Sequence, residues 1–357
     1  MPRVCVIAEA GVNHNGDPDL ARRLVEAAVA AGADAVKFQT FKASRVASSC
    51  AGKAAYQQRT TGADESQLAM LRRLELSEST HRDLMALCRA RGIAFLSTPF
   101  DLESVDLLVG LGVDRLKLPS GEITNAPLLL KAARTGLPLL LSTGMCGLAE
   151  VEEALGVLAY GMGDPGARPG RRAFRDAYAS SAGRAALARR VTLLHCTTEY
   201  PAPMAEANLR AMGTLARAFG LPVGFSDHTE GIVAAVAAVA LGAVVVEKHF
   251  TLDRALPGPD HTASLEPDAL AALVVAVRQA EAALGDGIKV ATPSERANMA
   301  IARRSLVARR DLAAGETLDT AGLAVKRPGT GISPMDYYEY LGRRTIRAYR
   351  ADELLEP

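Results

Sequence analysis

Two stretches of this chain place a histidine directly after a short apolar run. The first reads Gly-Phe-Ser-Asp and ends at His228, and the second reads Val-Val-Val-Glu-Lys and ends at His249. If both runs are strands, the period of two puts Ser226 beside His228 on one face and Glu247 beside His249. Two imidazoles on neighbouring strand ends have two interpretations. They either bind a metal together, or each is a core or loop residue whose hydrogen bonds are satisfied within the protein. Without a third imidazole or a thiolate, the pair suits a Mn²⁺-type octahedral ion with open positions, which would polarise a carbonyl and hold a water.

Polar side chains also gather where other apolar runs end. The charged and amide residues of this kind are Glu9, Lys37, Gln39, Lys117 and Glu122. Each alone suits a solvated loop, but in a parallel barrel the strand ends meet at one face and supply the catalytic groups. Together they describe a site with cationic anion handles and carboxylates beside the histidine pair.

Two turns that combine a hydroxyl side chain with a glycine indicate a phosphate-binding site. Ser120-Gly and Ser142-Thr-Gly both lead into helical stretches, where backbone N–H groups and hydroxyls suit a phosphate. With two lysines nearby, they predict a phosphorylated substrate. Asp260, in Pro-Gly-Pro-Asp, either grips a polyol hydroxyl or belongs to a proline-rich turn.

The elements that position these residues alternate along the chain. Eight apolar runs predict strands, at Val4–Glu9, Ala35–Thr40, Ile93–Thr98, Arg115–Ser120, Pro138–Thr143, Val191–Thr197, Pro222–Asp227 and Ala243–Phe250. Amphipathic stretches lie between them, and many end in glycine, a typical helix C-cap. Eight such units predict an α/β fold, the (β/α)8 TIM barrel. A doubly wound open sheet is the alternative, but no Gly-x-Gly-x-x-Gly follows the first strand.

The predicted domains are a barrel over 1–284, a linker over 285–303 and a small β-rich domain over 304–357. Residues 42–76 are expected to form a long polar loop at the barrel mouth, and residues 161–190 an exposed insertion on the sixth helix. In the C-terminal domain, the alternation over 304–318 predicts a hairpin with its turn at Ala-Gly-Glu. A domain of this size is marginal by itself, so we expect it to rest on something larger.

Composition excludes several functional classes. The 357 residues carry 41 Lys and Arg against 40 Asp and Glu, a net charge of +1 with no basic patch for nucleic acid. The longest apolar run is too short for a membrane span. Five scattered cysteines without CxxC spacing suit reduced thiols. A strand pattern begins at once, leaving no room for a signal peptide, so we expect a soluble, cytoplasmic protein.

The ordered motifs resemble the sialic acid synthase family. The matching strings lie at Ile7–Gly16, Val36–Thr40, Ser97–Asp101, Pro119–Asn125, Leu141–Met145, Leu193–Thr197, Phe225–Thr229, Glu247–Asp253 and Leu256–His261. The tail strings Arg303–Ala308 and Val325–Ile332 resemble the family's antifreeze-like (SAF) domain. The resemblance covers nearly the whole chain except the insertion.

This resemblance implies a condensation of phosphoenolpyruvate with an N-acetylmannosamine-type sugar, giving a nonulosonic acid and phosphate. It implies a divalent metal at His228 and His249, Mn²⁺ first and Mg²⁺ or Co²⁺ otherwise, and proton transfer or cation stabilisation by Glu9 and Glu122. The implied phosphoenolpyruvate-binding residues are Lys37, Thr98, Lys117, Ser120, Ser142 and Thr198, the last standing where the family often has Asn. The implied sugar-binding residues are Gln39, Tyr200, Asp260 and the partner chain's Arg327, which requires a homodimer with exchanged C-terminal domains.

Several alternatives stay open at this point. N-acetylneuraminate is the first expected product, and N,N'-diacetyllegionaminate, made from 2,4-diacetamido-2,4,6-trideoxymannose, is the alternative. Pseudaminate ranks lower. An aldolase using free pyruvate would not need two phosphate-type turns, and a non-catalytic carbohydrate-binding protein would not need a rim of Glu, Lys and His.

Overall fold

The computed structural model describes residues 3–62, 64–163 and 168–357. Its residues divide into two compact units, 1–286 and 287–357, and each is described here by itself. Among the described residues, no helix is both long and apolar enough to cross a membrane.

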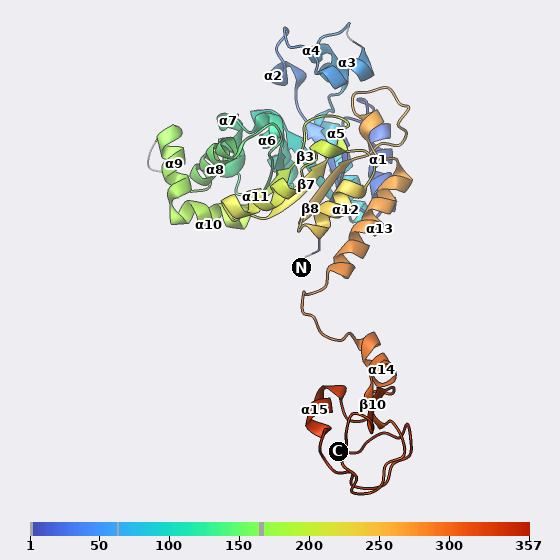
Figure 1. The fold of residues 1–357 in the computed structure, drawn as a ribbon. Helices are drawn as coiled ribbons and strands as arrows, with labels where there is room; N and C mark the ends of the chain where they lie inside the picture. The colour runs from blue at the N-terminus through green and yellow to red at the C-terminus, as the bar shows by residue number, and fades with distance from the viewer. Residues whose placement is uncertain (1–2, 63, 164–167) are drawn as a thin grey trace. The chain divides into compact units, whose positions relative to one another are not determined.

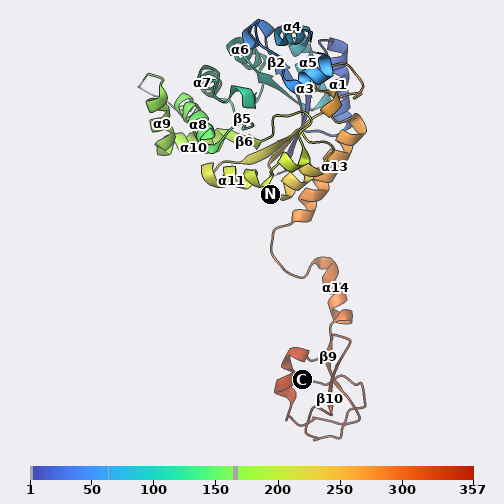
Figure 2. The same ribbon diagram turned by 45° about the horizontal axis from the view of Figure 1, so that its top comes forward.

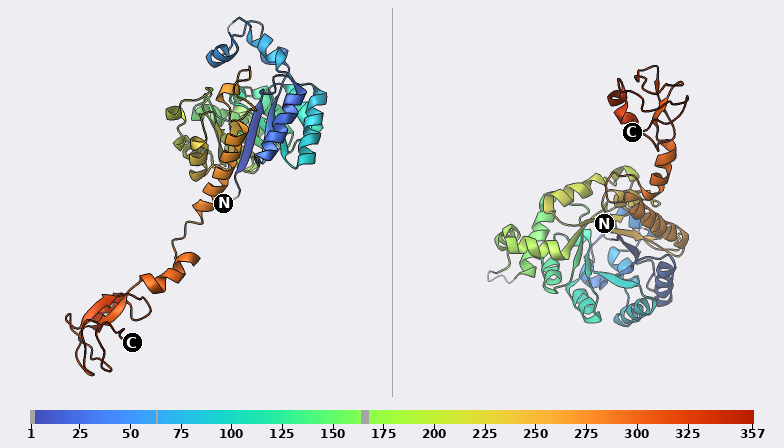
Figure 3. Two further views of the ribbon diagram at one scale, coloured as in Figure 1. Left: turned by 90° about the vertical axis from the view of Figure 1, so that its right-hand side faces the viewer. Right: turned by 90° about the horizontal axis from the view of Figure 1, so that it is seen from below.

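The first unit is the predicted (β/α)8 barrel. Its eight parallel strands are β1 (Cys5–Gly11), β2 (Ala35–Thr40), β3 (Ala94–Pro99), β4 (Leu116–Leu118), β5 (Leu139–Ser142), β6 (Val191–His195), β7 (Val223–Asp227) and β8 (Val245–His249). They are hydrogen-bonded in the order β3-β2-β1-β8-β7-β6-β5-β4, and β3 contacts β4 to bring the sheet close to full closure. Every predicted strand is therefore confirmed, and the open-sheet alternative is wrong. Seen from below, the strands form the centre and the helices the outer ring (Figure 3, right).

The outer helices follow the strands in turn. They are α1 (Pro18–Ala30), α5 (Glu78–Arg91), α6 (Leu102–Leu111), α7 (Ala126–Arg134), α8 (Leu148–Met162), α11 (Arg210–Phe219), α12 (Val233–Ala240) and α13 (Pro267–Leu284). Ordinary cap chemistry sets several ends: the Asp17, Ser77 and Asp101 side chains accept from the first turns of α1, α5 and α6. Glycines with positive φ, Gly92 and Gly112, end α5 and α6.

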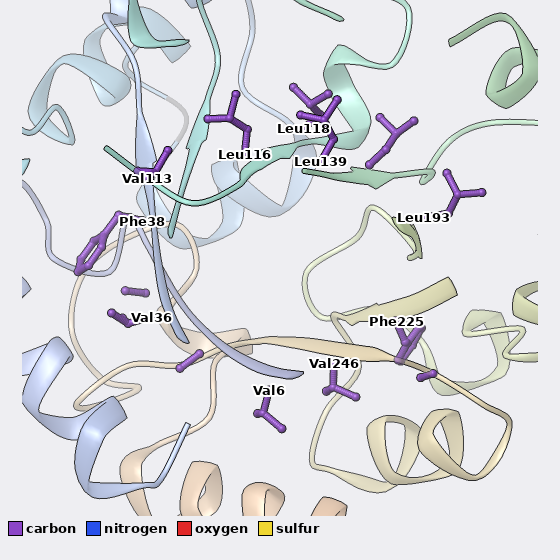
Figure 4. Packing of buried hydrophobic residues seen from close by; sticks show 14 of the residues in the cluster. Val6, Val36, Phe38, Val113, Leu116, Leu118, Leu139, Leu193, Phe225 and Val246 are labelled. Atoms are coloured by element: carbon purple, nitrogen blue, oxygen red, sulfur yellow. The ribbon is translucent and has the colours of Figure 1, made fainter. Parts of the chain in front are cut away.

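The main hydrophobic core lies between the strands and these helices. Outward-facing side chains such as Val6, Val36, Phe38, Phe225 and Val246 pack there (Figure 4). A separate apolar layer fills the barrel interior and consists of Ile7, Ala35, Leu96, Leu140, Leu194 and Val245. On five of these six strands, the next inward position two residues further along is polar, and these residues are Glu9, Lys37, Thr98, Ser142 and Glu247. The period of two thus stacks a polar layer directly on an apolar one.

The expected polar loop over 42–76 is wrong in its local structure. It contains three short helices, α2 (Ala43–Val46), α3 (Ala55–Thr61) and α4 (Gln67–Arg73), grouped at the barrel end opposite the N-terminus (Figure 1). A small apolar cluster of Val12, Phe41, Met70 and Leu74 anchors α4. The helix α3 has no buried residue, so its sequence lacks the apolar stripe by which a helix is normally predicted.

The segment expected to be an exposed insertion is largely exposed over its described residues, and it is helical. The region continues α8 to Met162 and then forms α9 (Arg171–Ala179) and α10 (Ser181–Arg190), while residues 164–167 lie outside the described part. Both helices pack against α8, as Figure 2 shows. The Phe174 ring meets the Tyr160 ring edge-on at 5.2 Å, and the backbone of Phe174 lies over Gly156, where an added Cβ would stand 3.0 Å from its carbonyl oxygen. The segment is therefore a packed helical addition.

The second unit begins with α14 (Pro293–Ala302), which lies inside the segment expected to be a linker. Its antiparallel strands are β9 (Ser305–Ala308) and β10 (Leu323–Lys326), and its short helix is α15 (Tyr337–Tyr340). The predicted hairpin within 304–318 is wrong, because β9 pairs with β10 and Leu312 forms its bridge with Tyr349. The turn itself is present, with Glu316 N donating to Ala313 O at 3.2 Å.

Candidate active site

A buried network of charges fills the polar layer of the barrel. Lys37 Nζ lies 2.8 Å from Glu9 Oε2 and 3.5 Å from Glu247 Oε2. Lys117 Nζ donates to Glu247 Oε1 at 3.0 Å, and Ser226 Oγ donates to the same oxygen at 2.8 Å. Because two lysines face two glutamates, the cluster is balanced in charge although it is almost fully withdrawn from water.

The two carboxyl groups have opposite environments. Burial raises the pKa of Glu9 above its usual value, and the attraction of Lys37 does not reverse this. Burial alone would also raise the pKa of Glu247, but Lys117 and Lys37 hold that pKa below its usual range. Burial alone would lower the pKa of Lys117, but the neighbouring carboxylates of Glu247 and Glu9 outweigh burial, and the pKa of Lys117 is raised. Such divergence suits Glu9 to proton exchange and Glu247 to a fixed negative charge.

The predicted histidine pair stands beside this network. The ring centroids of His228 and His249 are 5.6 Å apart, and β1 pairs Glu9 with His249 in register. His228 Nδ1 donates to Thr197 O at 2.6 Å, so its lone pair is on Nε2, which lies 3.4 Å from Ser226 Oγ. His249 Nδ1 is buried and has no hydrogen-bond partner.

These two rings could hold a metal ion. Burial lowers the pKa of His228 to about 4 and that of His249 well below its ordinary value, so both imidazoles are neutral, as metal binding requires. A metal–nitrogen bond is about 2 Å long, so rings at this spacing lie within reach of one ion. No group of three or more His, Cys, Asp or Glu residues is arranged for a metal in the described chain.

Predicted phosphate-site hydroxyls converge next to Lys117. Ser120 Oγ accepts from Gly144 N at 2.9 Å and lies 3.1 Å from Cys196 Sγ. A Cβ on Gly144 would stand 2.4 Å from Thr198 Oγ1 and 2.8 Å from Ser120 Oγ, so only glycine fits between these groups.

Two hydroxyl oxygens of this region, Ser142 Oγ and Thr198 Oγ1, are buried without a partner. Such groups ordinarily have one. They are therefore available to an oxygen-rich ligand. On β3, Thr98 Oγ1 accepts from Lys37 Nζ at 2.8 Å.

Aromatic residues form the wall beyond the histidines. The Tyr200 ring lies 4.2 Å from the His228 ring and 5.4 Å from the His249 ring. From α3, the Tyr56 ring lies 4.9 Å from Tyr200. Burial raises the pKa of Asp260 to about 7, and its Oδ2 lies 4.0 Å from His249 Nδ1. The structure therefore brings Tyr200 and Asp260 to the imidazole pair.

Two predicted residues of the barrel, Glu122 and Gln39, have no ion pair with these buried charges in the described chain. Glu122, in the short turn Ser120–Glu122, accepts from Asn125 Nδ2 at 2.6 Å and is joined to the buried charges by no ion pair in the described residues. Gln39 follows Lys37 on the inward face of β2, paired in register with Thr98. Arg327 belongs to the second unit, where its Nε donates to Ala302 O at 3.1 Å.

Sequence reasoning missed Glu247 and Tyr56 as site residues. The signal for Glu247 was present, because the period of two places it beside His249, but its central role depends on lysines from β2 and β4. Tyr56 gave no signal, since it lies in the region read as a loop. His81 lies outside the site, and its ring nitrogens are satisfied by Thr40 Oγ1 at 2.8 Å and Ser77 O at 2.9 Å.

Comparison with known proteins places this geometry in a family. The NeuB family matches residues 24–289, and the SAF domain matches residues 303–357. The N,N'-diacetyllegionaminic acid synthase of Campylobacter jejuni is 51% identical over 355 residues, covering 99% of this chain and 99% of the relative. That of Legionella pneumophila is 47% identical over 339 residues, covering 95% and 89%. The solved N-acetylneuraminic acid synthetase of Leptospira borgpetersenii is 32% identical with a TM-score of 0.67, covering 83% of this chain and 90% of that one.

Proposed function

The chain belongs to the NeuB family, and we propose that it condenses phosphoenolpyruvate with 2,4-diacetamido-2,4,6-trideoxymannose to give N,N'-diacetyllegionaminate and phosphate. The observation that carries the reaction class is the buried Glu9–Lys37–Glu247–Lys117 network beside two neutral imidazoles. The names of the two relatives at 51% and 47% identity favour this sugar over N-acetylmannosamine, which the sequence analysis ranked first.

The chain's residues divide the chemistry by position. Lys37 and Lys117 bind the anionic groups of phosphoenolpyruvate, and the hydroxyls of Ser120, Ser142 and Thr198 receive oxygens around Gly144. Inside a dry barrel these contacts are stronger than in water and fix the orientation of the enol. In this proposal the same residues exclude bulk water from the site, and only the one water molecule that the reaction consumes enters.

Bond making and breaking follow from that orientation. The C2=C3 electron pair of phosphoenolpyruvate forms the bond from C3 to the sugar's aldehyde carbon, whose oxygen takes up a proton, and C2 is left electron-deficient. Water adds at C2 and gives up one proton. The C2–O bond to the phosphoryl group then breaks as the C2 hydroxyl loses its proton, which leaves the keto group and hydrogen phosphate. Glu9, whose pKa burial raises, exchanges the proton, while Glu247 stays ionised and holds both lysines in place. Glu122 serves near the attacking water in this proposal.

We also propose a divalent cation, Mn²⁺ first, at His228 and His249. The buried and unpartnered Nδ1 of His249 and the fixed tautomer of His228 support it. When bound, such an ion would polarise the aldehyde oxygen of the sugar. Chelator treatment should abolish phosphate release and added Mn²⁺ should restore it, whereas full activity in metal-stripped protein would exclude the metal.

The sugar is tested by parallel assays. Phosphate release and product mass are measured with phosphoenolpyruvate plus either the diacetamido sugar or N-acetylmannosamine. A higher kcat/KM for the diacetamido sugar supports the proposal, and a preference for N-acetylmannosamine supports the second candidate, N-acetylneuraminate synthase. No release with either sugar overturns both.

A homodimer with exchanged C-terminal units is the remaining part of the proposal, with Arg327 acting on the partner's sugar site. Two inactive chains, Arg327→Ala and Glu122→Ala, are co-expressed to test it. Random pairing makes half of the dimers mixed, and each mixed dimer has one intact site, so roughly a quarter of wild-type activity should return. Recovery no greater than the sum of the two parents would show that Arg327 does not act in trans.

A further inference from the structure

The outward faces of β7 and β8 carry a buried ion pair that the reaction does not use. Lys248 Nζ donates to Asp227 Oδ2 at 2.8 Å, and the two side chains are 1% and 0% exposed. The two residues are also paired in register between the strands. Withdrawing a charge pair this completely from water is costly, so its location calls for an explanation.

A third residue, Thr229, joins this pair in a hydrogen-bond network. Asp227 Oδ1 accepts from the backbone N of Thr229 at 2.9 Å and from its Oγ1 at 2.8 Å. Lys248 Nζ in turn donates to the Thr229 carbonyl oxygen. The chain is therefore held immediately before and immediately after His228.

The location of this hydrogen-bond network matters because the parallel ladder between β7 and β8 ends there. The register of β7 against β8 runs from Phe225–Val246 to Asp227–Lys248. His228 and His249 come one residue later on each strand. The outward ion pair is thus the last registered contact before both imidazoles, and it links the two strand ends at that point.

Other contacts leave the imidazoles little freedom once the strand ends are fixed. Ala202 N donates to the His228 carbonyl oxygen at 2.8 Å, and the ring donates to Thr197 O. Leu265 N donates to the His249 carbonyl oxygen at 2.9 Å. None of these contacts joins β7 to β8. At the strand ends the two strands are joined by the ladder, by the inward Ser226–Glu247 hydrogen bond and by the outward Asp227–Lys248 pair, and the outward pair is the one nearest to both histidines along the chain.

We propose that Asp227 and Lys248 are positioning residues that hold His228 and His249 at the spacing a single divalent cation needs. This inference rests on the metal site of the proposed function. It predicts a specific defect in cation affinity when the pair is removed, because residues behind metal ligands typically change affinity by about 10- to 100-fold.

The main test is the double variant Asp227→Asn/Lys248→Met, which removes both charges together and leaves neither one buried alone. Mn²⁺ alone is the probe, titrated into metal-stripped full-length protein and followed by the electron paramagnetic resonance signal of free Mn²⁺. The Kd for Mn²⁺ should rise about 10- to 100-fold, while the circular dichroism spectrum at the titration temperature stays that of the parent. If the double variant does not fold, Thr229→Val replaces it and should raise the Kd severalfold.

Thr40→Val is the matched control. Thr40 is a buried, outward-facing polar residue at the end of β2, bonded to Ser97 and His81, and it belongs to a different strand pair. It should lower the thermal midpoint without changing the Kd. An equal loss of Mn²⁺ affinity in this control would mean general loosening and overturn positioning, as would an unchanged Kd in the double variant.

A parent protein that binds no Mn²⁺ also overturns the inference, since there is then nothing to position. The phosphate-release assay separates that result from failure of the proposed reaction. A parent that is active and binds Mn²⁺, with variants that bind it equally well, leaves the proposed function standing and removes the positioning role alone.

Discussion

The polar layer of the barrel and the helical segment over its mouth are held in opposite ways. In the layer, Lys37 and Glu247 are almost wholly buried and each makes more than one charged or hydrogen-bonded contact. Over the mouth, α3 has no buried residue and reaches the barrel through the ring of Tyr56, the exposed ion pair Arg59–Glu199 and one hydrogen bond from Thr60. The contrast separates a fixed chemical centre from a segment that opens at low cost.

The largest expected effect comes from breaking the centre itself. Glu247→Gln removes the partner of two buried lysines, and loss of one member of a buried pair costs about 3–5 kcal/mol of unfolding free energy. Urea denaturation should show that loss, and phosphate release should fall with it. A variant of unchanged stability and normal kcat would mean that Glu247 is not central to the layer.

The next effect separates chemistry from stability. Glu122 is half-buried and bonded to Asn125, so Glu122→Gln should leave the unfolding midpoint near that of the parent. Loss of a general acid–base group should still lower kcat by about 10²- to 10⁴-fold. The check is steady-state kinetics beside the same denaturation curve as for Glu247→Gln. Near-parent kcat would remove Glu122 from the proposed mechanism.

A smaller effect is expected at the mouth, where the far half of the sugar would lie. Tyr56→Ala should narrow the preference for the diacetamido sugar over N-acetylmannosamine by about tenfold, the scale of one apolar contact in a pocket. The kcat/KM ratio of the two sugars measures it, with Tyr56→Phe as the control that keeps the ring. An unchanged ratio in Tyr56→Ala would show that this wall does not read the substrate.

The smallest effect belongs to the exposed tether. Arg59 and Glu199 are 62% and 40% exposed, and their 2.8 Å ion pair should contribute less than about 1 kcal/mol. Arg59→Ala, Glu199→Ala and the double variant form a cycle whose coupling energy should shrink as salt is added. A coupling energy as large as the loss of unfolding free energy expected for Glu247→Gln would mean that the mouth is held as strongly as the polar layer.

The sequence predicted the centre better than the mouth for a physical reason. The strands were identified because apolar runs alternate with amphipathic ones, and the period of two already placed Glu247 beside His249. What it did not contain was the pairing of side chains inside the predicted barrel, where Lys37 and Lys117 from two other strands meet the same carboxylate. That meeting is a property of the ring of strands.

Elsewhere the missing information was also non-local. The helix α3 carries no apolar stripe, because its contacts are with loops beyond β6 and β8. In the C-terminal unit, β9 pairs with β10 across the intervening loop, so the local alternation over 304–318 indicated the wrong partner. Pairing choices of this kind are decided by packing against distant residues.

The apolar layer beneath the charges has a consequence for traffic. Ile7, Leu96, Leu140, Leu194 and Val245 fill the barrel interior beneath the polar layer, so the buried charges face the carboxyl ends of the strands. If the proposed reaction takes place there, both substrates reach Lys37 and Lys117 from that one side. The substrate bound deeper then has to arrive first, and it is covered by the second until the reaction is complete.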